Sequence, residues 1–197
     1  HVMRCLTLAN VLASKGFQCS FVVGHTAEDV VPSLKTSTHK VIVSDNLSDP
    51  KELFLYWPEG IEWLIVDDYR LSKTFESACR SLTQYIMVID DLANREHDCD
   101  LLFDQAQGKT KENYHFLAPE NCHFLLGTDY ALLREEYSQQ RVSSLNRNRK
   151  EIKRILVALG GTDPEDFTSI VLKGLAKANV KDLEVDVVLG PASPNIS

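Results

Sequence analysis

Apolar segments of strand length that alternate with helical segments are the feature of this sequence that most constrains its fold. The clearest apolar segments are residues 63–66 and 85–89, and each is followed by a pair of aspartates. Shorter apolar segments occupy residues 17–23, 40–43, 101–103 and 123–126. Strands that are apolar on both faces are typical of a covered parallel sheet, and alternation with helices implies βαβ crossovers. The sequence therefore predicts an α/β fold with an open parallel sheet.

The chain starts directly with an amphipathic helical pattern. Apolar residues recur at helical spacing and are followed by a stop at Gly16: Val2, Cys5, Leu6, Ala9, Leu12 and Ala13. Further helices are predicted over residues 28–34, 49–56, 71–82 and 131–140. A helix with no strand before it, and a strand at 184–189 close to the last residue, lead us to expect an internal fragment of a longer protein.

A basic segment interrupts the alternation of predicted strands and helices. Residues 141–154 carry six basic residues and one acidic residue, which is typical of a solvated connection. A new unit follows, with a strand at 155–159, a turn at 160–164, a helix at 165–178 and the strand at 184–189. We place a domain boundary near Asn148, so that residues 1–147 form one domain and residues 148–197 the start of a second.

Charge and cysteine usage narrow the classes of function. The chain has 28 acidic and 21 basic residues, a net charge of −7, which disfavours a nucleic-acid partner because such binding depends on clustered positive charge. No apolar run approaches the ~18 residues of a membrane span. The five cysteines are scattered and odd in number. They indicate buried free thiols and a cytoplasmic protein.

The start of the first helix is a candidate for chemistry. In doubly wound α/β folds, ligands bind beyond the carboxyl ends of the strands, where helices begin. The positive end of a helix dipole disfavours imidazolium, so a histidine there stays neutral and can act as a base. His1 has this position, and Arg4 lies about one turn further on. The alternative interpretation is that His1 and Val2 are a cloning remnant before an initiator Met3.

Acidic pairs at two strand ends are the next candidates. Asp67 and Asp68 precede Tyr69, and Asp90 is followed by Asp91. Such groups either hold sugar hydroxyls or a magnesium ion, or cap the following helix or turn. We favour the capping role for Asp67 and Asp90, and a binding role for Asp68, Tyr69 and Asp91.

Two other motifs are weaker candidates for a functional site. The cluster at residues 97–100 combines histidine, cysteine and aspartate, but adjacent residues of this kind rarely converge on one ion, so a structural loop is expected. Gly160 and Gly161 follow a strand, where glycines let backbone N–H groups approach a phosphate. Two glycines alone leave that role open.

Seven motifs occur in one order and together resemble the UDP-2,4-diacetamido-2,4,6-trideoxy-β-L-altropyranose hydrolase family of pseudaminic acid biosynthesis. They occupy residues 1–9, 66–69, 88–93, 99–102, 126–127, 130–135 and 160–164. The resemblance extends over essentially the whole chain. It implies a GT-B architecture, in which two Rossmann-like domains with parallel sheets face each other across a cleft. On this resemblance we expect the second domain to be truncated in this chain, and the first strand and glycine loop before His1 to be missing from it.

The resemblance also implies an activity and site residues. Family members hydrolyse the sugar–phosphate bond with inversion, and a histidine after the N-terminal glycine loop, matching His1, is taken as the general base. Tyr69 matches a tyrosine near the sugar, Arg134 a substrate contact, and the turn at 160–161 a phosphate-facing turn. We expect a monomer that takes a UDP-sugar substrate, acts in the pathway that supplies flagellin glycosylation, and uses neither metal nor cofactor.

Two other classes of function stay open. A GT-B glycosyltransferase would pass the sugar from the same UDP-sugar donor to an acceptor instead of water, and a non-catalytic nucleotide-sugar binding module would need no base. The predicted first helix carries only Arg4 and Lys15 as cations. That composition favours the hydrolase over a transferase that works at a membrane surface.

Overall fold

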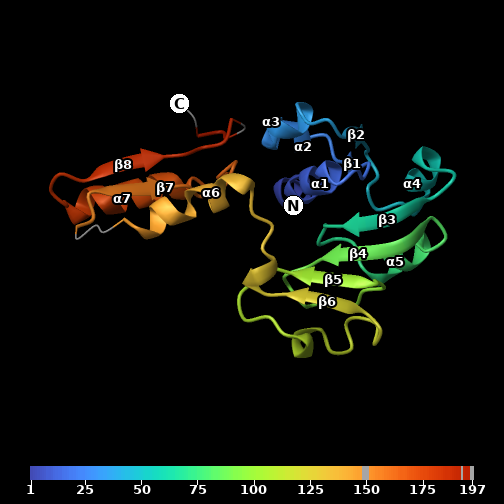
Figure 1. Cartoon of the computed structure of the whole chain (residues 1–197). Helices are drawn as coiled ribbons and strands as arrows, with labels where there is room; N and C mark the ends of the chain where they lie inside the picture. Colours follow the sequence, from blue (N-terminus) through green and yellow to red (C-terminus); the bar gives the residue numbers. More distant parts are fainter. Residues whose placement is uncertain (148–150, 192, 196–197) are drawn as a thin grey trace. The chain divides into compact units, whose positions relative to one another are not determined.

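The computed structural model describes residues 1–147, 151–191 and 193–195, and its described part divides into two compact units (Figure 1). The first unit contains His1–His25 and Thr38–Arg134, and the second contains Thr26–Ser37 and Glu135–Ser197. The boundary expected near Asn148 falls on residues outside the described part of the chain.

Parallel strands form the centre of the first unit. Its larger sheet has the order β3-β4-β5-β6, with β3 at Ile61–Val66, β4 at Thr83–Ile89, β5 at Leu101–Asp104 and β6 at His123–Leu126. A smaller sheet pairs β1 (Ser20–Val23) with β2 (Lys40–Val43). Every strand pair is parallel. The predicted α/β class with parallel strands is confirmed.

The helices and 3-10 turns of this unit are α1 (Val2–Ser14), α4 (Pro50–Tyr56), α5 (Lys73–Cys79), η1 (Lys111–Tyr114) and η2 (Thr128–Tyr130). The prediction of α1 and α4 was close, and the side chain of Asp49 caps α4 by accepting from the N–H of Lys51. Helix α5 is shorter than the predicted span of residues 71–82.

The β3–β6 sheet is covered on both faces. On one face, Met87, Ile89 and Phe103 pack against Cys5 and Leu8 of α1. The other face carries the larger apolar cluster, which includes Val66, Val88, Leu102 and the buried side chains of α5. Because successive strand residues point to opposite faces, Ile65, Met87 and Ile89 face α1, whereas Leu64, Val66, Ile86 and Val88 face the larger cluster.

The second unit contains a smaller set of elements: α2 (Ala27–Val30), α3 (Pro32–Lys35), α6 (Glu135–Leu145), β7 (Arg154–Val157), α7 (Phe167–Ala178) and β8 (Glu184–Val187). Strands β7 and β8 are parallel neighbours, as the predicted βαβ unit requires. Helix α6 starts later than predicted, because residues 128–130 form a 3-10 turn and the acidic Glu135 and Glu136 favour a helix start there. It then extends to Leu145, so the segment expected to be a solvated connection is partly helical.

Two further expectations concern the chain as a whole. Within the described residues, no helix combines the length and the apolar character needed to cross a bilayer. The five cysteines are free thiols; Cys79, Cys99 and Cys122 are buried and the other two are half-buried.

Candidate functional site

A hydrogen-bonded cluster lies where α1 begins and β3 ends. His1 is the N-cap residue of α1, and its Nδ1 lies 2.5 Å from Oδ1 of Asp67, the residue that follows β3. The imidazole is 40% exposed, whereas the Asp67 side chain is only 4% exposed. The cluster therefore joins a solvent-accessible ring to a buried carboxylate.

Arg4 binds this carboxylate and a second one. Its Nη2 donates to Oδ1 of Asp67 at 2.6 Å and its Nε donates to Oδ2 at 2.8 Å, a two-point contact that matches the planar guanidinium. Its Nη1 donates to Oδ2 of Asp91 at 3.2 Å. These hydrogen bonds, that to Asp67 above all, raise the pKa of Arg4 above its usual range. Arg4 therefore stays charged and fixes the separation of the two carboxylates.

Tyr69 completes the cluster. Its hydroxyl donates to Oδ1 of Asp91 at 2.7 Å, and this bond raises the pKa of the phenol. Its ring meets the His1 imidazole edge to face, with 4.6 Å between the ring centroids and 78° between the planes. The contacts thus form a closed circuit that runs from His1 through Asp67, Arg4, Asp91 and Tyr69 back to His1.

The alternation of side chains along the strands explains why these aspartates meet. Ile65 faces α1, so Asp67, two residues later, continues on the same face, and Asp91 follows Ile89 in the same way. The sequence favours a capping role for Asp67, but in the structure this residue is at the centre of the cluster, between His1 and Arg4. The signal that identifies it is the continuation of the two-residue period past the end of β3.

The other aspartate of each pair has a local role. Asp68 accepts from the N–H of Arg70 and forms an ion pair with its guanidinium, contacts that hold the pKa of Asp68 below its usual range. Asp68 therefore stabilises the turn after β3, while the contacts around His1 involve Asp67.

Asp90 belongs to a buried network on the opposite face of the sheet. Burial raises its pKa, but the N–H of Ala93 and the guanidinium of Arg95 outweigh that effect and lower it overall. The hydroxyl of Tyr114 bridges Asp90, at 3.1 Å, and Asp104, at 2.8 Å. The capping role expected for Asp90 agrees with these contacts, which tie the ends of β4 and β5 together.

The remaining predicted site residues lie elsewhere in the chain. Arg134 is exposed between η2 and α6, and the circuit around His1 does not include it. Gly160 and Gly161 follow β7 in the second unit, and Gly160 has a φ of 99°, a conformation that favours glycine.

The turn after β7 is tightly built. A Cβ atom on Gly190 would lie 2.2 Å from the carbonyl oxygen of Gly161, so the backbones of the loops after β7 and β8 are in direct contact there. The first N–H groups of α7 are occupied, because the carboxylate of Asp163 accepts from the N–H groups of Phe167 and Thr168. The geometry shown is that of a capped helix start beside a glycine turn.

The cluster at residues 97–100 has structural partners. Nδ1 of the buried His97 lies 2.8 Å from Oε1 of Glu76, and Arg80 forms ion pairs with Asp98 and Asp100. In the part of the chain that the structure describes, no group of three or more histidine, cysteine or acidic side chains is arranged to hold a metal ion.

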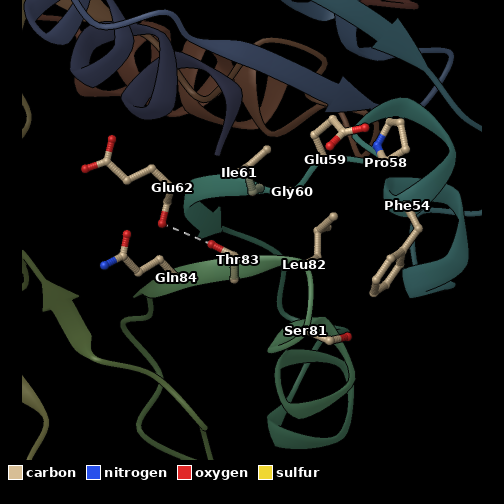
Figure 2. A pocket seen from close by; sticks show the side chains of 10 residues that line it. All are labelled: Phe54, Pro58, Glu59, Gly60, Ile61, Glu62, Ser81, Leu82, Thr83 and Gln84. Carbon is tan, nitrogen blue, oxygen red and sulfur yellow. Dashed lines mark hydrogen bonds between the residues drawn. The ribbon is translucent and has the colours of Figure 1, made fainter.

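A pocket of about 590 Å³ lies at the opposite end of the β3–β6 sheet (Figure 2). It is lined at the starts of β3 and β4 by Ile61, Glu62, Thr83 and Gln84, and Thr83 donates there to the carbonyl of Glu62. Ligands of open α/β sheets bind beyond the carboxyl ends of the strands. The His1 cluster, at those ends, is therefore the better candidate site.

Comparison with known proteins adds an independent observation. No family model matches the chain. It is 30% identical to an uncharacterized protein of Methanocaldococcus jannaschii, in an alignment that covers 97% of this chain and 40% of that protein. It is 25% identical to the UDP-2,4-diacetamido-2,4,6-trideoxy-beta-L-altropyranose hydrolase of Campylobacter jejuni, over all of this chain and 66% of that enzyme. The chain is thus a distant homologue of a UDP-sugar hydrolase and spans only part of the length of both relatives.

Proposed function

We propose that this protein hydrolyses a UDP-linked 2,4-diacetamido-2,4,6-trideoxyhexose to UDP and free sugar, with inversion at the anomeric carbon, as a step of pseudaminic acid biosynthesis. The observation that carries the proposal is the circuit around His1, which places an exposed imidazole beside two carboxylates and a phenol at the carboxyl ends of β3 and β4. The distant relationship to a UDP-sugar hydrolase supports the choice of substrate.

His1 is the general base in this proposal. Its imidazole takes a proton from water as the water oxygen bonds to the anomeric carbon, and the bond from that carbon to the phosphate oxygen breaks. The electron pair of the broken bond leaves with UDP. Inverting hydrolysis needs a base that activates water on the face of the sugar opposite the leaving group. Because UDP is a good leaving group, the proposal assigns no general acid. Base assistance of this kind is typically worth ~10²–10⁴-fold in rate.

Other residues of the first unit take part in binding the sugar. Tyr69 and Asp91 form a donor–acceptor pair beside His1, and both side chains are accessible enough to exchange this bond for one to a hydroxyl or acetamido group. The charges of Arg4, Asp67 and Asp91 sum to −1, which suits a glycosyl centre that gains positive character in the transition state better than it suits a phosphate.

The architecture proposed for the protein is of GT-B type, and the second unit supplies the side that binds UDP. Its β7–α7–β8 arrangement with a glycine turn supports this assignment. Gly160 and Gly161 are proposed to face the diphosphate, and Arg134 to contact the substrate.

The test is incubation of the natural full-length protein with the UDP-sugar in ¹⁸O-labelled water, followed by NMR and mass spectrometry. The proposal predicts free UDP without label, free sugar with ¹⁸O at the anomeric carbon, and the inverted anomer as first product. Release of UDP only when a sugar acceptor is added would instead identify a glycosyltransferase, and binding without turnover would identify a binding module.

A further inference from the structure

We infer that Asp67 is the positioning residue of the site: it fixes the tautomer and orientation of the His1 imidazole, so that Nε2 is the nitrogen that accepts a proton. The catalytic consequence of this inference rests on the proposed function. The tautomer itself does not, because it follows from the contacts of one carboxylate.

The protonation of the ring follows from the partners of Asp67. Its two oxygens receive donors from Arg4 at 2.6 and 2.8 Å and from the thiol of Cys5 at 3.3 Å. A carboxylate that receives a bidentate arginine is ionised and acts only as an acceptor. The 2.5 Å contact with Nδ1 therefore requires a hydrogen on Nδ1, and in the neutral ring this leaves Nε2 without one.

A second contact of Nδ1 favours the opposite tautomer, but its length shows that it is the weaker of the two. Nη2 of Arg4 lies 3.3 Å from Nδ1, whereas Oδ1 of Asp67 lies at 2.5 Å. Guanidinium is only a donor, so a hydrogen bond at 3.3 Å would need an unprotonated Nδ1. The shorter, charge-assisted bond to the carboxylate determines the tautomer.

The orientation of the ring is fixed from two sides. Asp67 holds one edge, and the edge-to-face contact with Tyr69 limits rotation about the side-chain bonds. Tyr69 is in turn held by Asp91, and Asp91 by Arg4, which also binds Asp67. When His1 takes a proton, the buried carboxylate of Asp67 already faces the new positive charge, so no group has to reorganise.

A purely structural role for Asp67 is the competing explanation, because the same carboxylate anchors Arg4 on α1. Kinetics separate the two roles in the full-length protein. Asp67→Asn keeps the shape but removes the charge, and it is expected to lower kcat by about 10²-fold with little change in KM. Asp67→Glu, which retains the carboxylate, is expected to restore part of kcat. The control is Asp98→Asn, which also removes the charge of an arginine-bound aspartate but lies outside the His1 cluster, and it is expected to leave kcat unchanged.

A double variant tests whether the two residues act as one unit. If Asp67 acts through His1, adding Asp67→Asn to His1→Asn lowers kcat no further than His1→Asn alone. Losses that multiply would show that Asp67 acts independently of the base, and would overturn the inference while leaving the proposed function in place.

The tautomer is measured without any assay of activity. In ¹⁵N-labelled full-length protein, long-range ¹H–¹⁵N correlation spectra distinguish a protonated Nδ1 from a protonated Nε2, and the His1→Asn variant identifies the signals of His1. We expect the neutral ring to carry its hydrogen on Nδ1, and the population of that form to fall in Asp67→Asn. A hydrogen on Nε2 in the unaltered protein would overturn the inference, even if the protein proves to be a hydrolase. If no UDP-sugar is hydrolysed, this spectrum still decides the role of Asp67.

Discussion

Nδ1 of His1 lies 2.5 Å from Oδ1 of Asp67, although 66 positions separate the two residues in the sequence. The bond links the first residue of the chain to the end of a strand in the middle of the first unit. It places an exposed ring on a buried anion at the edge of the sheet where α/β proteins bind their ligands.

Replacement of His1 tests the proposed base. His1→Asn is expected to lower kcat by ~10²–10⁴-fold with a smaller effect on KM, because the asparagine side chain cannot take a proton from water at neutral pH. The measurement is UDP release by the full-length protein, and His25→Asn is the control, because His25 forms a similar but exposed pair with Asp45. Near-normal turnover of His1→Asn would direct the search for a base to Asp68, Tyr69 or Asp91.

Removal of metal ions tests the expectation that hydrolysis needs no bound metal. Fixed N–H groups and arginine can stabilise a leaving diphosphate without an ion, and the side chains of His97, Asp98 and Asp100 are bound to Glu76 and Arg80. Hydrolysis is expected to survive dialysis against EDTA. A zinc hydrolase treated in the same way serves as the control and has to lose its activity; loss in both proteins would contradict the prediction.

Arg4 is expected to be important for stability as well as for the site. Arg4→Ala removes the main partner of a carboxylate that is 4% exposed, and breaking such a pair typically costs ~3–5 kcal/mol of unfolding free energy. Urea denaturation at pH 7 measures this loss. Arg70→Ala is the matched control, because Arg70 is 73% exposed and pairs with its neighbour Asp68; its cost should stay below ~1 kcal/mol. Equal losses in the two variants would mean that burial of Asp67 is not what makes Arg4 important.

Acid sensitivity is expected to depend on Asp98. Hydrogen bonds from Arg80 hold the pKa of Asp98 below its usual range. A carboxylate with a lowered folded-state pKa stabilises the protein above its unfolded value of about 4, and this stabilisation is lost as the pH falls through the folded value.

Asp98→Asn should therefore lose ~1 kcal/mol of unfolding free energy at pH 7 and show a weaker decline from pH 5 to pH 3 than the unaltered protein. Urea denaturation across this pH range is the measurement. Asp45→Asn, whose side chain is 90% exposed, is the control. An unchanged pH dependence in Asp98→Asn would refute the assignment.

The strands were predictable from sequence because short, continuous apolar runs are typical of strands buried in a parallel sheet. The segments at 63–66 and 85–89 lie within β3 and β4, and the alternation with helices correctly gave parallel pairing. Helix ends were less predictable, since α6 is exposed along its length and no apolar face marks where it begins or ends.

The choice between adjacent aspartates was harder for a different reason. Asp67 and Asp68 have the same chemistry and adjacent positions, but the strand period directs Asp67 towards α1 and Asp68 towards its own turn. Only the face covered by α1 decides which of them meets His1, and that face is set by packing of the whole unit. The assignment of His1 as base, and of Arg134, Gly160 and Gly161 as substrate contacts, remains a prediction.

The single hydroxyl of Tyr114 has a consequence for how the sheet assembles. It contacts Asp90 just after β4 and Asp104 at the end of β5, and a slip of one residue between these strands would turn Asp104 to the opposite face. A mispaired sheet would then bury a carboxylate that lacks its hydrogen bond from Tyr114. This loss raises the free energy of the incorrect strand pairing while the chain folds. Refolding rates of Tyr114→Phe, compared with those of Tyr85→Phe on the exposed part of β4, measure that penalty.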